Sequence, residues 1–114
     1  MSDLCLPKPS RDLVDRRRGL APESEDAFRA FSKAVFAEGA LDTRTKQLVA
    51  VAVAHVTQCP WCIEGHVKAA RREGASSEQI MEAIWVASEM RAGAAWAHAL
   101  KAVDVIGDAE KHES

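Results

Sequence analysis

The sequence predicts an all-α domain of about five helices, and three observations support this fold class. Apolar side chains recur every three to four residues through most of the chain, which is the spacing of one helix face. Apolar types make up 47% of the 114 residues, or 54, and 21 of these 54 are alanine, the strongest helix former. The length suits one domain and leaves no room for a second.

Composition along the chain predicts three parts. Residues 1–20 look like an N-terminal arm, because Pro7 and Pro9 block regular structure. Residues 21–107 carry the helical periodicity and form the domain. Residues 108–114 are polar, and we expect a disordered tail there.

The first helix of the domain is expected to begin at Pro22, since proline favours the first helical position. Phe28, Phe31 and Val35 follow at helical spacing and predict its buried face. Gly39 is the expected stop signal.

The next segment begins after Asp42, an acceptable N-cap, and continues into the apolar stretch Leu48–Ala54. Its alternating valine and alanine could also form a strand, because valine favours sheets and the period is two. The helix is favoured, because alanine fills every other position and the preceding residues are compatible with a helix. Such an element must be buried on nearly all sides, so we expect it to be the central helix.

Two further helices have clear start signals. Cys59 and Pro60 begin one that ends before Gly74, and Ser76 with Gln79 forms a capping box for the next. Gly93, among alanines, indicates either a break or a close helix contact. A last helical stripe is expected before Gly107 at Trp96, Ala99, Leu100, Val103 and Ile106. We expect Trp85 and Trp96 to be packing anchors.

Charge and hydropathy exclude several function classes. The net charge of −2 leaves no basic excess to neutralise the phosphates of a nucleic acid. The apolar stretch Leu48–Ala54 is far shorter than the roughly 20 residues that cross a bilayer, and the N-terminus lacks the apolar region of a signal peptide. We therefore expect a soluble, cytoplasmic protein.

Only 33 apolar or cysteine side chains are larger than alanine (54 minus 21), so the core is lean and burial against a second subunit is favoured.

The chemistry points to the run CPWCIEGH, in which Cys59 and Cys62 are followed by His66. At about 100° per residue the three side chains project from one face at the start of a helix. There the helix dipole stabilises a thiolate on Cys62, His66 can accept its proton, and Cys59 can close a disulfide. A thiol peroxidase or dithiol oxidoreductase needs this combination.

Other interpretations stay open at this point. The pair could be half of a zinc site completed by His66 and by His55 or His98, although no second close ligand pair exists. A thioredoxin-like fold would need strands that the sequence does not supply, and the cysteines could also be incidental. Trp61 could cover the thiols or pack in the core, and Cys5 is interpreted as a bystander in the arm.

The segment Leu41–Leu100, a little over half the chain, resembles the core domain of alkyl hydroperoxidase D and carboxymuconolactone decarboxylase-like proteins. The resemblance rests on the cysteine motif, the preceding apolar helix and the MRAGAA segment. It implies an all-helical fold that assembles as a trimer or hexamer.

By position, the resemblance implies that Cys62 is the peroxidatic thiol, Cys59 the resolving thiol and His66 part of a proton relay. The family's relay glutamate, twelve residues before the first cysteine, corresponds here to Gln47. Glutamine can hold a hydrogen bond but cannot take a proton, so the relay is incomplete unless His55 substitutes.

The implied function is reduction of organic hydroperoxides without a bound cofactor or metal, with re-reduction by an external dithiol such as a lipoyl-bearing partner. Two alternatives remain: a decarboxylase or isomerase acting on a small lactone, and a non-catalytic metal-binding or redox-sensing module.

Overall fold

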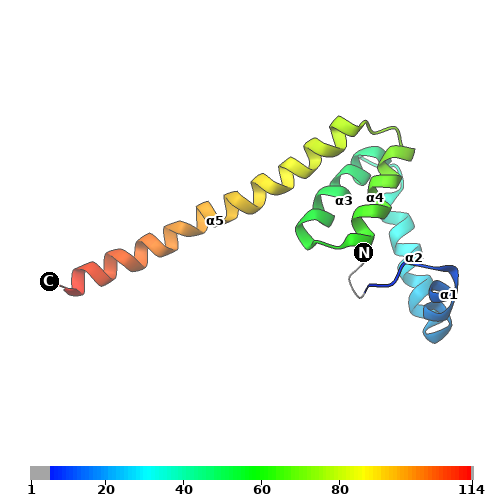
Figure 1. The fold of residues 1–114 in the computed structure, drawn as a ribbon, viewed down its shortest axis with the longest axis horizontal. Helices are drawn as coiled ribbons and strands as arrows, with labels where there is room; N and C mark the ends of the chain where they lie inside the picture. Colours follow the sequence, from blue (N-terminus) through cyan, green and yellow to red (C-terminus); the bar gives the residue numbers. More distant parts are fainter. Residues whose placement is uncertain (1–5, 114) are drawn as a thin grey trace. The chain divides into compact units, whose positions relative to one another are not determined.

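The computed structural model describes residues 6–113, which form five α-helices and no β-strand. The all-α prediction is therefore confirmed. The helices are α1 (Arg11–Leu20), α2 (Pro22–Phe36), α3 (Thr43–Thr57), α4 (Pro60–Arg72) and α5 (Ser77–Glu113) (Figure 1). They divide between two units, Met1–Lys46 and Gln47–Ser114.

In the first unit, α1 lies where the sequence predicts an irregular arm, so that prediction is wrong for residues 11–20. Pro7 and Pro9 precede the helix and do not interrupt it. The hydroxyl of Ser10 accepts a hydrogen bond from the Leu13 amide at 3.2 Å and caps the first turn. Cys5 lies outside the described residues.

Ion pairs join α1 to α2. The Arg17 guanidinium donates to both carboxylate oxygens of Glu25, at 2.9 and 3.1 Å, and Arg18 lies 2.9 Å from Asp26. These arginine contacts lower the pKa of Glu25, the hydrogen bond from Arg17 being the largest cause. Helix α2 begins at Pro22 as predicted and ends at Phe36, three residues before the predicted stop at Gly39.

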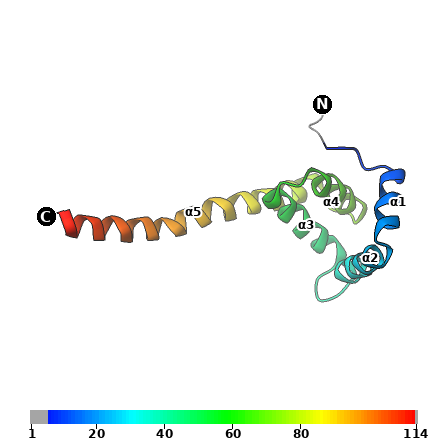
Figure 2. The same ribbon diagram turned by 90° about the horizontal axis from the view of Figure 1, so that it is seen from below.

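Helices α3 and α4 lie side by side in the second unit, and the N-terminal part of α5 packs on α4 (Figures 1 and 2). Their starts agree with the sequence signals. The Asp42 carboxylate accepts from the Thr45 amide at 2.7 Å, and Cys59 is the N-cap of α4. The core between them is small. Its buried members are Val51, Ala70, Ala75 and Ile80, with Leu48, Val67 and Ile84 packed against them.

Helix α5 is longer than predicted. It runs unbroken from Ser77 to Glu113, through Gly93 and through the segment expected to be a disordered tail. Alanines surround Gly93, and a Cβ at this glycine would meet only the flexible side chain of Glu89, so no close backbone contact explains the glycine. Lys111 and His112 in the last turn favour the helix through its dipole. Of the two alternatives expected at Gly93, a break or a close helix contact, the break is therefore wrong.

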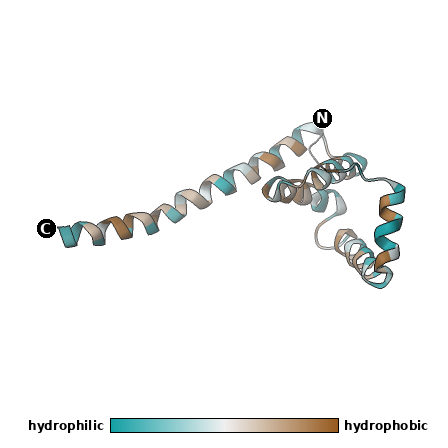
Figure 3. Ribbon diagram, turned by 60° about the horizontal axis from the view of Figure 1, so that its bottom comes forward, coloured by the Kyte–Doolittle hydropathy of each residue, from teal (hydrophilic) through white to brown (hydrophobic). Residues whose placement is uncertain are grey.

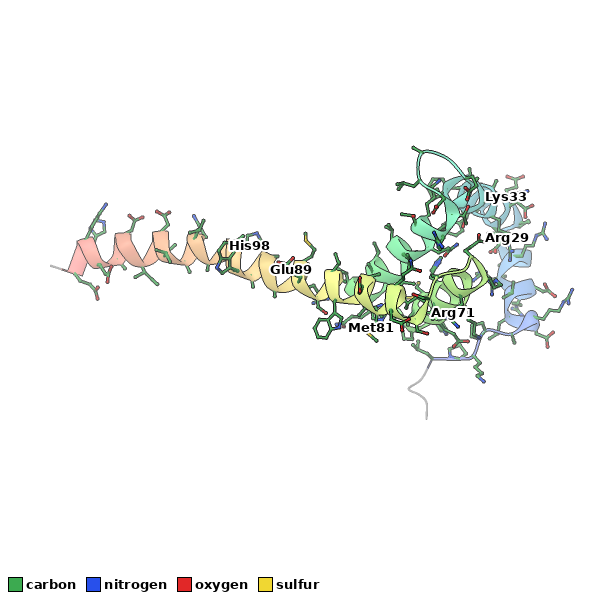
Figure 4. The ribbon with its side chains drawn as sticks, turned by 90° about the horizontal axis from the view of Figure 1, so that it is seen from above. Arg29, Lys33, Arg71, Met81, Glu89 and His98 are labelled. Atoms are coloured by element: carbon green, nitrogen blue, oxygen red, sulfur yellow. The ribbon has the colours of Figure 1, made fainter. Side chains whose placement is uncertain are left out.

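Several faces that the sequence predicts to be buried are exposed. Helix α3 buries only the face of Gln47, Val51 and Ala54, and not nearly all sides as expected. The predicted core residues of α2 and α5 are likewise exposed: Phe28, Phe31, Val35, Trp85, Trp96, Leu100, Val103 and Ile106. Along α5, brown apolar turns alternate with teal polar ones (Figure 3). The side chains of Glu89 and His98 lie on this helix (Figure 4). These faces are therefore uncovered in the single chain.

No helix among residues 6–113 is both long and apolar enough to cross a membrane.

The capping box of α5 gives a stability prediction. The Ser76 hydroxyl accepts from the Gln79 amide at 3.0 Å, and the Gln79 side chain accepts from the Ser76 amide at 2.9 Å. Ser76→Ala should lower the free energy of unfolding by about 1 kcal/mol. Urea denaturation at fixed protein concentration measures this loss. Ser88→Ala, an exposed mid-helix position, is the matched control and should be neutral or slightly stabilising; equal midpoints for the two variants would contradict the prediction.

Candidate functional site

The dithiol lies at the turn between α3 and α4. Helix α3 ends at Thr57, and Gln58 then adopts a left-handed conformation with φ of 57°. This single residue reverses the chain, so that the Cys59 amide donates back to the Ala54 carbonyl at 3.2 Å. Cys59 therefore lies between two helix ends, at the C-terminus of α3 and the N-terminus of α4.

The two cysteines are hydrogen-bonded to one another through the first turn of α4. The Cys59 sulfur accepts from the Cys62 amide at 3.3 Å, which makes Cys59 the side-chain cap of the helix. Cys59 is half-buried and Cys62 is exposed, and both are free thiols. Cys62 is thus the more accessible of the two thiols.

The pKa values of the two cysteines are shifted in opposite directions. A hydrogen bond from the Cys62 side chain, followed by the Cys62 amide, lowers the pKa of Cys59. The same side-chain hydrogen bond, with burial and the charge on Cys59, raises the pKa of Cys62. The sequence-based expectation of a lowered pKa at Cys62 is therefore wrong for the reduced pair. The reason is that the N-cap sulfur of Cys59 receives the helix donors and Cys62 becomes a donor itself.

His66 is oriented by Gln47. The His66 Nδ1 lies 2.7 Å from the Gln47 Oε1, which joins α4 to α3 across 19 residues of sequence. An amide oxygen only accepts, so Nδ1 carries the proton and the neutral ring has its acceptor nitrogen at Nε2. Gln47 is the one buried polar residue within 6–113, at 9% exposure. The buried amide therefore favours the tautomer with an unprotonated Nε2.

His55 has a different surrounding. Its Nδ1 lies 2.7 Å from the Val51 carbonyl, one turn earlier in its own helix. The contact with Gln47 is made by His66 and not by His55. The backbone of α3 thus occupies one ring nitrogen of His55, and this is the arrangement of a structurally satisfied histidine.

Trp61, between the two cysteines, is 44% exposed and therefore does not pack fully in the core. Within the described part of the chain, no three His, Cys, Asp or Glu side chains come together closely enough to hold a metal ion.

Sequence reasoning missed one residue next to the site. The Arg91 guanidinium on α5 donates to the Val56 carbonyl in the last turn of α3 at 2.8 Å. Helical spacing is the sequence signal that could have placed Arg91 near the buried face of α5. At about 100° per residue, Arg91 lies within about 40° of Ile80 and Ala87, the buried residues of α5.

Comparisons with known proteins identify the family of this chain. The sequence profile of the carboxymuconolactone decarboxylase family matches residues 22–105. The chain belongs to the carboxymuconolactone decarboxylase family. The match covers α2 to α4 and most of α5, and so includes the cysteine pair, Gln47 and His66.

Relatives and solved structures agree with this membership. A Paracoccus denitrificans protein known as uncharacterized protein 4 in the cox locus is 68% identical over 108 residues, covering 95% of this chain and 96% of its own. The crystal structure of a Legionella pneumophila protein of this family is 33% identical with a TM-score of 0.66, covering 69% of this chain and 70% of its own.

A further crystal structure, of a Thermotoga maritima protein of the family, is 30% identical with a TM-score of 0.57. It covers 79% of this chain and 93% of its own, and its description suggests a role in antioxidative response.

Proposed function

We propose that this protein is a dithiol peroxidase that reduces organic hydroperoxides. The observation that carries the proposal is the hydrogen-bonded pair of Cys59 and Cys62 at the start of α4, on the helix that also holds His66 with its base tautomer set by Gln47. Family membership and the description of the Thermotoga maritima relative support an antioxidant role.

In the proposed reaction, His66 takes the proton of the exposed Cys62 thiol. The resulting thiolate attacks the terminal peroxide oxygen, the O–O bond breaks, and Cys62 becomes a sulfenic acid. The leaving alkoxide takes the proton from His66 and departs as an alcohol. The peroxide is thus reduced by two electrons, which come from the Cys62 sulfur.

Cys59 completes the cycle. The Cys62 amide, which donates to the Cys59 sulfur, favours a thiolate there. This thiolate attacks the Cys62 sulfur and expels hydroxide, which leaves as water after protonation. The product is a Cys59–Cys62 disulfide. An external dithiol, for which a lipoyl group is the proposed example, reduces this disulfide by thiol–disulfide exchange. A reducing compartment such as the cytoplasm would supply it.

The exposed faces support a homo-oligomer, proposed as a trimer or hexamer. At about 100° per residue, Trp96 and Val103 lie within about 20° of Trp85, roughly opposite to the face of α5 that packs on its own chain. Trp96 is 82% exposed and Leu100 is 75% exposed. A second copy of the chain is the proposed cover for this stripe, because large exposed apolar patches mark contact surfaces.

The function is tested by peroxide consumption with cumene hydroperoxide and a dihydrolipoyl reductant, comparing the wild type with a Cys59→Ser, Cys62→Ser double variant. The proposal predicts turnover only in the wild type. Decarboxylation of a small lactone that survives in the double variant would favour the lyase alternative, and absence of any turnover in the wild type would favour a non-catalytic redox module. Equal peroxide consumption by the two proteins, or none by the wild type, would contradict the peroxidase proposal.

Position 47 gives a second prediction. A carboxylate in Gln47→Glu would stabilise the imidazolium that forms when His66 takes the Cys62 proton, which the neutral amide cannot do. We expect peroxide reduction to be about three- to tenfold faster in Gln47→Glu and slower than wild type in Gln47→Ala. Stopped-flow measurement of thiol oxidation gives both rates.

The matched control for the added charge is Gln79→Glu, which preserves the capping box of α5. This variant should leave the rate unchanged. If Gln47→Glu and Gln47→Ala both reacted at the wild-type rate, the contact between position 47 and His66 would have no part in proton transfer.

A further inference from the structure

The turn that carries Cys59 exposes this sulfur to two opposing helix dipoles. The N-terminus of α4, which Cys59 caps, stabilises a thiolate there. The C-terminus of α3 ends two residues earlier, at Thr57, and its free carbonyls carry partial negative charge that disfavours the same thiolate. The Cys59 amide donates directly to one of these last-turn carbonyls, that of Ala54.

Arg91 contributes a positive charge at this second helix end. Its guanidinium donates at 2.8 Å to the Val56 carbonyl, three residues before Cys59, although the two residues are 35 positions apart in sequence. The contact lies one helical turn beyond Ala87, a buried residue of α5, so the packing of α5 on its own chain brings the guanidinium to this carbonyl. A cation on the C-terminal carbonyls offsets the negative end of the dipole.

We propose that Arg91 is a positioning residue for the dithiol: by binding the C-terminal carbonyl of α3 it offsets the negative helix end beside Cys59 and raises the fraction of Cys59 that is thiolate at neutral pH. This inference rests on the proposed function for its biological purpose, but it concerns the state of the thiol and is measurable without peroxide. The other titratable groups on the adjoining turns of these helices are His55 on α3, Cys62, Glu64 and His66 on α4, and Glu89 on α5.

The test measures the pH dependence of alkylation of Cys59 by iodoacetamide. A Cys5→Ser, Cys62→Ser background leaves Cys59 as the single thiol, and serine at 62 keeps the amide donor and a hydroxyl donor. In this background Arg91→Gln, which can keep a hydrogen bond but not the charge, should slow alkylation at pH 7 by about two- to fivefold and move the titration midpoint upward. Arg91→Lys should retain most of the native rate.

Two controls separate charge from folding and from general electrostatics. Arg72→Gln removes an exposed arginine from the last turn of α4 and should leave the profile unchanged. Helical circular dichroism of each variant should match that of the background chain. An Arg91→Gln profile that superimposes on the native one would overturn the proposal, and so would an equal shift in Arg91→Gln and Arg91→Lys, because the effect would then not follow the charge. Failure of peroxidase activity alone would leave these alkylation profiles unaffected, so the two proposals fail separately.

Discussion

Cys62→Ser is expected to reduce hydroperoxide turnover by at least about 1000-fold, equivalent to about 4 kcal/mol of transition-state stabilisation. The serine hydroxyl stays protonated in this site and is a far weaker nucleophile towards a peroxide oxygen than a thiolate. Cys62 is the exposed member of the pair, so its loss removes the sulfur that an incoming substrate meets first. Consumption of cumene hydroperoxide in the presence of excess dithiol measures the effect.

Cys59→Ser is the matched control, because it removes the partner and keeps the proposed nucleophile. This variant should react once with peroxide, accumulate a sulfenic acid on Cys62 that a dimedone probe traps, and then stop. The reverse pattern, with one turnover in Cys62→Ser and none in Cys59→Ser, would contradict the assigned roles and make the lower-pKa thiol of Cys59 the nucleophile.

Trp96→Glu is expected to dissociate the proposed homo-oligomer. Trp96 is 82% exposed in the single chain. Burying its remaining ~160 Å² would contribute on the order of 4 kcal/mol per site at ~25 cal/mol per Å². A charge there would weaken association by about three orders of magnitude. Sedimentation or light scattering should give a multiple of 12.4 kDa for the wild type and a smaller species for the variant.

The control for this result is Lys101→Glu, a charge reversal on the same helix. At about 100° per residue, position 101 lies about 140° from Trp96, so the mass of the assembly should not change. Two results would contradict the proposal that a second copy of the chain buries the exposed apolar face of α5. One is a Trp96→Glu assembly with the wild-type mass, and the other is a wild type that is a monomer at micromolar concentration.

The sequence predicted well the features that depend on neighbouring residues. Pro22 begins α2, the Asp42 carboxylate caps α3, and the Ser76–Gln79 box begins α5, because each signal acts within one turn of backbone. The contact between Cys59 and Cys62 is also local, because the N-cap sulfur accepts from the amide three residues later. The placement of Cys59, Cys62 and His66 on one helix face stays a prediction.

Features that depend on distant contacts were predicted poorly. Periodicity identifies an apolar face but not what covers it, so Phe28 and Trp96 were assigned to a core that one chain does not contain. The contact between Gln47 and His66 joins two helices, and the family resemblance, not a local pattern, brought these two residues together. The order of the thiol pKa values depends on which sulfur receives the hydrogen bonds, and this required the geometry of the cap.

The central claim is tested most directly by counting thiols in the purified protein before and after one equivalent of cumene hydroperoxide, with no reductant present. The account predicts prompt loss of two thiols per chain in the wild type, a Cys59–Cys62 disulfide in the peptide map, and no comparable loss in Cys62→Ser. Thiols that stay unreacted through this treatment would contradict a peroxide-reducing dithiol and leave the family's cysteine-independent chemistry as the better explanation.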